Sequence, residues 1–154
     1  MIPHTPQRGF TLLIAVVLTA VLLSVGFALL DIAYKQIVLS STARNSQYAF
    51  YAADSAMECA LYWDQQHNAF SAASALASIR CSGYDIPVTS STAGGIRTST
   101  FSIPCPGSGS SASVEVQKGG VCSGSATSCL YTRGYNSCNA ADQRRVERAL
   151  KVTY

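Results

Sequence analysis

The sequence predicts an α+β protein in which one long N-terminal helix packs on a C-terminal antiparallel β-sheet. Three observations support this fold class. An uncharged apolar run extends from Phe10 to Leu30, no Gly or Pro occurs between Asp31 and Phe70, and the second half of the chain contains short segments in which apolar and polar residues alternate. We expect the first two segments to form one helix and the alternating segments to form the sheet.

The apolar run is long enough to cross a membrane. It holds 21 residues without any Asp, Glu, Lys, Arg, Asn, Gln or Pro, and as a helix it would span about 30 Å, the thickness of a bilayer core. The whole chain of 154 residues is 48% hydrophobic and only 12% charged, which is apolar for a soluble protein. A cleaved secretory signal is the alternative, but its apolar part is usually shorter and no good A-x-A cleavage site follows Leu30. A plain membrane anchor remains open.

The segment 31–66 is predicted to continue the helix as an amphipathic outer half of a helix of about 50 residues. Apolar and small residues recur there at spacings of three or four, on a stripe made of Tyr34, Ile37, Val38, Ser41, Tyr48, Ala49, Ala52, Ala56, Cys59, Ala60 and Trp63. Charged residues are expected on the other face, namely Lys35, Arg44, Asp54, Glu58 and Asp64. We expect a globular head, residues 67–154, to cover the apolar stripe.

The head is predicted to contain about four antiparallel strands. Period-two alternation marks the segments 98–104, 113–117, 129–135 and 144–154. Gly94-Gly95 and Gly119-Gly120 are expected to form turns, the segment 106–113 a loop, and the segment 71–80 a short second helix or turn.

Six cysteines favour disulfides and an oxidising compartment. They all follow the apolar run, at Cys59, Cys81, Cys105, Cys122, Cys129 and Cys138. Fifteen connectivities are open; Cys122 with Cys129 and Cys59 with Cys81 are two pairings considered. The C-x-x-C spacing of zinc or redox sites is absent from the sequence, so we expect no metal and no cofactor.

The first residues resemble the leader of type IV pilins and pseudopilins. A short polar stretch, MIPHTPQRG, ends in Gly9 and is followed by Phe10 and the uncharged helix. The stretch 46–64, SQYAFYAADSAMECALYWD, is similar to a segment common in PilX-like minor pilins, and TRGYNSCNAADQRRVERALKVTY resembles their closing strands. The resemblance covers about half of the chain, and residues 66–127 are unmatched.

The resemblance implies the type IV pilin fold and a structural subunit rather than an enzyme. A prepilin peptidase would cut between Gly9 and Phe10 and methylate the new amine. The mature chain would sit in the inner membrane through residues 10–30, with its head outside the cytoplasm, and then enter a filament. Its partners would be the major pilin, other minor pilins and the assembly platform. A pilus, a type II secretion pseudopilus and a competence fibre remain alternatives.

One position departs from the family pattern. The fifth residue after the cleavage is usually Glu, whose carboxylate neutralises the amine of a neighbouring subunit, and here it is Ile14. Since an unpaired ammonium in an apolar core is costly, Ile14 argues against the bulk subunit. A subunit that caps or initiates the filament and a rare subunit tolerated along the shaft both remain open. Asp31 is expected at the membrane interface rather than as a replacement.

The C-terminal basic residues offer a further hypothesis. Five of them fall within nineteen positions, at Arg133, Arg144, Arg145, Arg148 and Lys151. A tip pilin that binds DNA or a surface receptor could use them, with Tyr131 and Tyr135 for stacking. Glu147 and Asp142 dilute this charge, so a solvated strand face is the simpler interpretation. Asn136, Asn139 and Asp142 could ligate calcium, although an Asn- and Asp-rich turn is the default. His67, the only histidine after the leader, is expected to be solvated, and catalysis is not expected.

Overall fold

The computed structural model describes residues 8–105 and 109–154. Most of the predicted leader, residues 1–7, and the first three residues of the predicted loop, 106–108, lie outside the described residues. The chain divides into two compact units between Ser41 and Thr42. Both contain part of the long helix α1, Arg8–His67.

Helix α1 has 60 residues and is longer than the expected 50. It contains no proline, and its one glycine after Gly9, Gly26, has open space around it. The helix ends where Asn68 adopts a left-handed conformation with φ of 50°, a common way to close a helix. The amides of Asn68 and Ala69 then bond to the carbonyl oxygens of Asp64 and Trp63.

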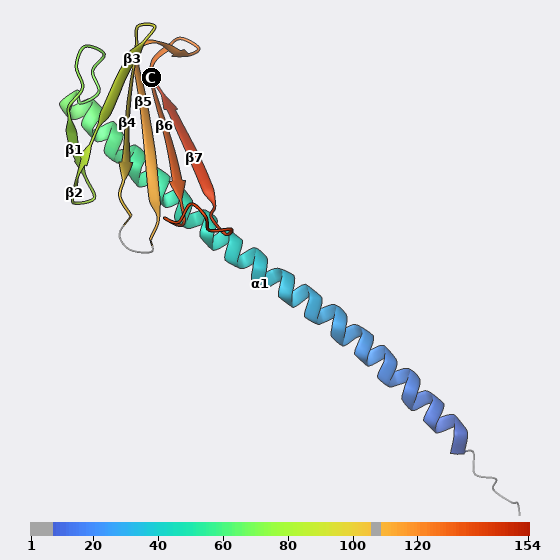
Figure 1. Ribbon diagram of the computed structural model, residues 1–154. Helices are drawn as coiled ribbons and strands as arrows, with labels where there is room; N and C mark the ends of the chain where they lie inside the picture. The colour runs from blue at the N-terminus through green and yellow to red at the C-terminus, as the bar shows by residue number, and fades with distance from the viewer. Residues whose placement is uncertain (1–7, 106–108) are drawn as a thin grey trace, which may run out of the picture. The chain divides into compact units, whose positions relative to one another are not determined.

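The unit 42–154 combines the last part of α1 with seven strands, as Figure 1 shows. Five of them form one antiparallel sheet in the order of the sequence: β3 (Thr89–Ala93), β4 (Ile96–Ile103), β5 (Ser111–Ser123), β6 (Ala126–Tyr135) and β7 (Glu147–Thr153). A separate hairpin is made by β1 (Ser78–Cys81) and β2 (Tyr84–Pro87). The α+β fold class, a long helix packed on an antiparallel sheet, is confirmed.

Alternation along the strands gives the sheet one inner face. Phe101, Val114, Thr132 and Leu150 are neighbours across four strands, and Thr132 is fully buried. Ser99, Val116, Leu130 and Val152 form the next row. These rows join Ala56, Met57 and Ala60 of α1 in the hydrophobic core, so burial of the helix face by the sheet holds the head together.

Small residues let the helix and the sheet approach closely. Ala49, Ala53, Ala56 and Ala60 are completely buried. Gly134 on β6 lies directly against this stripe, because a Cβ atom added there would be 2.1 Å from the carbonyl oxygen of Ala49. Glycine is therefore required at position 134 by contact with the helix backbone.

Several local predictions were wrong. The segment 71–80 forms no second helix; a bridge pairs Phe70 with Ala75, and β1 begins at Ser78. Gly119-Gly120 does not reverse the chain, because β5 continues to Ser123 through an irregularity in its register after Lys118. Gly94-Gly95 does connect β3 to β4, with positive φ at both glycines.

The predicted stripe on α1 also needs three corrections. Tyr34, Ile37 and Val38 were expected on the covered stripe but are 69%, 69% and 48% exposed. Asp64 was expected on the charged outer face, but it is 4% exposed. It follows Ala60 by four residues and therefore lies on the buried side of the helix. Tyr48 was expected on the apolar stripe, yet it is 54% exposed because the sheet covers the alanines beside it instead.

Candidate functional site

The helical unit that ends at Ser41 presents its apolar side chains to the surroundings. From Phe10 to Leu39 the exposed large hydrophobic residues are Phe10, Leu12, Leu13, Ile14, Val16, Val17, Leu18, Val21, Leu22, Leu23, Val25, Phe27, Leu29, Leu30, Ile32, Tyr34, Ile37, Val38 and Leu39. By length and composition this helix could cross a membrane. An apolar surface of this extent marks a site of contact with lipid or with another protein.

Two hydroxyl groups inside this apolar segment, those of Thr19 and Ser24, are satisfied by the helix itself. The hydroxyl of Thr19 donates to the carbonyl oxygen of Val16 at 2.9 Å, and that of Ser24 donates to Val21 at 2.8 Å. The first ion pair along the segment joins Lys35 to Asp31 at 2.7 Å, beyond Leu30. The surface between Phe10 and Leu30 can therefore enter a dry environment without leaving these hydroxyls unpaired.

The predicted processing site lies at the start of the described helix. Phe10 is 64% exposed, and Gly9 belongs to the first turn of α1. Ile14, one turn further on, is exposed as well, and no carboxylate lies between it and Asp31. The structure thus places an exposed apolar side chain at position 14.

The five basic residues do not share one surface. Arg148 pairs with Gly134 in the sheet register and donates from Nε to the hydroxyl of Ser46 on α1 at 2.7 Å. Lys151 and Arg133 are on the opposite, outer face of the sheet, where Arg133 lies 3.9 Å from Glu147. Because the sheet separates these cations, their positive potential is divided between two faces.

The two tyrosines considered for stacking already contact cations. The guanidinium of Arg145 lies 3.8 Å from the ring centre of Tyr135, and the ammonium of Lys151 lies 5.1 Å from that of Tyr131. Such cation–π contacts occupy one face of each ring. The last of the five basic residues, Arg144, is exposed.

The Asn- and Asp-rich segment forms turns. The side-chain oxygen of Asn136 accepts from the amide of Val146 at 2.6 Å, and that of Asn139 accepts from Ala141 at 2.9 Å. Asp142 accepts from the amide of Arg144 at 2.9 Å, and this bond, helped by the Ser137 hydroxyl, lowers the pKa of Asp142. These oxygens bind backbone amides, as in Asx-turns.

Metal-binding groups do not gather in the part of the chain that the structure describes: no three His, Cys, Asp or Glu residues lie together as ligands there. His67 is exposed but contacts two rings of α1. Its Nε2 is 3.4 Å from the hydroxyl of Tyr62, and its ring centre is 4.6 Å from that of Trp63.

All six cysteines form disulfides. Cys59 pairs with Cys81 and Cys122 with Cys129, which are the two pairings considered from the sequence, and the remaining pair is Cys105 with Cys138. The first ties α1 to β1, beside a bond of 2.9 Å from the indole nitrogen of Trp63 to the carbonyl oxygen of Arg80. Cys122–Cys129 joins the end of β5 to β6, and Cys105–Cys138 joins the segment after β4 to the segment after β6.

A buried charged cluster was missed by the sequence reasoning. Lys118 Nζ lies 2.6 Å from Asp64 Oδ2, and the two side chains are 16% and 1% exposed. The hydroxyl of Tyr154 donates to the same carboxylate oxygen. Burial and this hydrogen bond raise the pKa of Tyr154. The alternation of Val114, Val116 and Lys118 was the signal that could have placed Lys118 on the inner face.

Comparison with family models, with curated proteins and with solved structures finds no match for this chain.

Proposed function

We propose that this chain is a minor pilin, a structural subunit that is held in the inner membrane by residues 10–30 and then assembles into a type IV filament. The observation that carries the proposal is the exposed apolar part of α1, which continues without a break into a helical segment that a small disulfide-bonded head covers on one face. Lipid and a bundle of similar helices are two environments that cover such a surface.

The role of the subunit in the filament follows from its first residues. Processing after Gly9 would leave the amine of Phe10 at the start of an apolar helix, and Ile14 offers no carboxylate to an adjacent amine. Repeated addition of this chain would bury one unpaired ammonium per subunit, at a cost of several kcal/mol each. A subunit that initiates or caps the filament is used once, so the cost is not repeated.

The same features support a second assembly. A minor pseudopilin of a type II secretion system would use the same leader, helix and head, and the distinction depends on the proteins that assemble with it. DNA binding receives less support, because Arg148 contacts α1 while Lys151 and Arg133 are on the outer face of the sheet.

Mass spectrometry of the chain from membranes and from sheared filaments tests the proposal. We expect the membrane-bound and filament forms to begin at N-methylated Phe10, with the chain at low copy number in the filaments. A Gly9→Val variant, in which the bond to Phe10 is shielded, should keep its leader and be absent from filaments. An intact Met1 in the wild-type chain, together with filaments that contain none of it, would contradict the proposal.

A further inference from the structure

A groove runs along one side of α1 in the head. It consists of two adjoining hollows that share Ser110, with volumes of about 430 and 150 Å³. The helix contributes Asn45, Tyr48, Ala52 and Ser55, which follow one another at spacings of three, four and three and so lie on one line of the helix surface. The other lining residues are Ser82, Tyr84, Ile103, Pro104, Gly109, Ser110, Ser111, Ala112 and Asn136.

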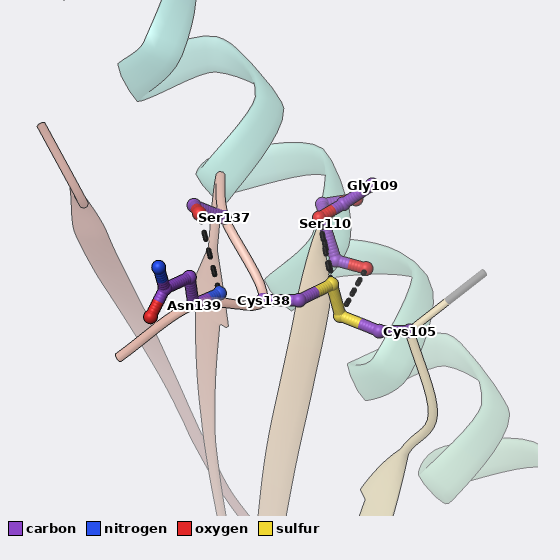
Figure 2. The surroundings of a disulfide bond; sticks show 6 residues. All are labelled: Cys105, Gly109, Ser110, Ser137, Cys138 and Asn139. Carbon is purple, nitrogen blue, oxygen red and sulfur yellow. Dashed lines mark hydrogen bonds between the residues drawn. A yellow bond between two sulfur atoms is a disulfide. The ribbon is translucent and has the colours of Figure 1, made fainter. Parts of the chain in front are cut away.

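A disulfide fixes the wall opposite the helix. Cys105 and Cys138 join the end of β4 to the segment after β6, and Gly109 and Ser110 lie against this bond, as Figure 2 shows. The carbonyl oxygen of Gly109 is 2.9 Å from Cys138 Sγ, and that of Ser110 is 3.8 Å from Cys105 Sγ. Since the facing wall is a helix, the groove is preformed on both sides.

The lining of the groove is polar but carries no charge. None of its residues is Asp, Glu, Lys, Arg or His. Within the described residues, the side chains of Asn45 and Tyr48 have no hydrogen-bond partner, and the rings of Tyr48 and Tyr84 are 54% and 45% exposed. The amide of Asn136 is already bonded to Val146 and Arg144, and the Ser55 hydroxyl donates to Ala52. The groove therefore offers the amide of Asn45, which can donate and accept, the hydroxyl groups of its serines and tyrosines, and two aromatic rings.

This chemistry narrows the class of ligand. A nucleic acid or an acidic polymer requires cations, which the lining lacks. A peptide strand requires an open sheet edge, but one wall is a helix whose backbone groups bond to each other, and an amphipathic helix requires a row of large apolar pockets. The aliphatic side chains of the lining are those of Ala52, Ile103, Pro104 and Ala112, all in the smaller hollow. Rings with many hydroxyl groups and no charge match the amide, hydroxyls and tyrosines.

We infer that this groove binds a neutral oligosaccharide. The larger hollow alone falls within the range of about 300 to 1,000 Å³ that is usual for small-molecule sites. The inference goes beyond the assembly role proposed above and does not depend on it, because the groove belongs entirely to the unit 42–154.

Ligand-observed NMR with the full chain tests this inference. The protein is kept in micelles of a polyoxyethylene detergent, which has no sugar headgroup to compete. The probes are maltopentaose, cellopentaose and chitopentaose, with a neutral Ser-Thr-Ala peptide and a short DNA duplex as competitors of other classes. We expect at least one pentasaccharide to bind, and neither the peptide nor the DNA to displace it.

Variants of the helix wall locate the binding site. Tyr48→Ala removes a ring, and Ser55→Trp fills the smaller hollow; each should weaken binding at least tenfold. Tyr62→Ala is the matched control, because Tyr62 is a similarly exposed tyrosine of α1 (55%) outside the lining. Intact disulfides and unchanged helix content verify the fold of every variant. The inference is wrong if no pentasaccharide binds the wild type, if the peptide or the DNA displaces it, or if the two groove variants bind like the Tyr62→Ala control.

Discussion

Replacing Gly134 by alanine tests how the sheet is seated on the helix. Gly134 is on β6 at the closest approach to α1, where a new Cβ atom would lie 2.1 Å from the carbonyl oxygen of Ala49 and 2.4 Å from the amide nitrogen of Ala53. Both are backbone atoms inside a helix, and neither can rotate away. The methyl group can be accommodated only if the sheet and the helix separate.

The required movement sets the size of the effect. Ordinary van der Waals contact with a Cβ atom begins near 3.4 Å, so the two layers would have to move apart by about 1.3 Å at this point. Ala49 and Ala53 are completely buried, and their contacts with the sheet would loosen. Overpacking of this kind costs about 1 to 3 kcal/mol, and because only backbone can yield we expect about 3 kcal/mol of lost unfolding free energy.

Gly120→Ala is the matched control. Its new Cβ would be 2.5 Å from Cγ1 of Ile96, an atom of a half-buried side chain rather than of helix backbone. The same substitution in the same sheet should therefore cost about 1 kcal/mol, at the lower end of overpacking effects. The difference between the two variants isolates the contact with the helix backbone.

Urea titration followed by tryptophan fluorescence measures both variants. Trp63 is the only tryptophan of the chain, and its indole bonds to Arg80 across the interface between α1 and β1. With a slope of about 2 kcal/mol per molar urea, a loss of about 3 kcal/mol lowers the midpoint by about 1.5 M. If Gly134→Ala unfolds at the wild-type midpoint while Gly120→Ala does not, the close seating of β6 on α1 is incorrect.

Three further predictions concern separate features. Tyr154→Phe removes the hydroxyl that binds Asp64 and should lower the free energy of unfolding by about 1 to 3 kcal/mol at neutral pH. Because the pKa of Tyr154 is raised in the folded state, the hydroxyl's contribution to stability is complete below about pH 10, where the unfolded side chain titrates, and is lost as the pH rises above it. The stability difference between variant and wild type should therefore shrink in urea titrations at alkaline pH. Replacing both cysteines of Cys122–Cys129 by serine should lower the free energy of unfolding by about 2.5 kcal/mol, because the sequence separation is 7 residues. The same replacement of Cys105–Cys138, with a separation of 33, should lower it by about 4 kcal/mol. If the thermal midpoints of the two variants fall in the opposite order, the loop-entropy argument is wrong. Under the proposed function, Ile14→Glu supplies a carboxylate for a neighbouring amine and should raise the copy number of the chain in sheared filaments, as counted by quantitative mass spectrometry, and an unchanged copy number would count against the charge argument.

The long helix and the main sheet could be predicted because their patterns are strong. No proline interrupts α1 after its start, and the strands β4 to β7 each alternate apolar and polar residues over a face that the helix covers. The strand β3 could not be found in this way. All five residues of its segment TSSTA are exposed, so the alternation that marks a half-buried strand is absent.

Other errors came from reading residue types without their neighbours. The alanines of 71–80 suggested a short helix or turn, but Ile79 and Cys81 are buried on β1, and the hairpin partner and the disulfide to Cys59 override helix propensity. Asp64 was assigned to the outer face because carboxylates are usually solvated. Its buried position depends on Lys118, which is 54 residues away in the sequence, and a local pattern carries no information on such a partner.

The two parts of α1 share one backbone geometry but differ in how many of their faces are apolar. In the head, alanines on one side let the sheet come close, and the other side keeps Tyr51, Glu58 and Tyr62 in solvent. Between Phe10 and Leu30 the apolar side chains point in every direction around the axis, so a partner on a single side would leave most of them in water. Lipid surrounds a helix completely, and so does a bundle in which the helix occupies an interior position. The head therefore needs only one face of α1, whereas the preceding segment needs an environment on all sides, which this chain does not supply from its own described residues.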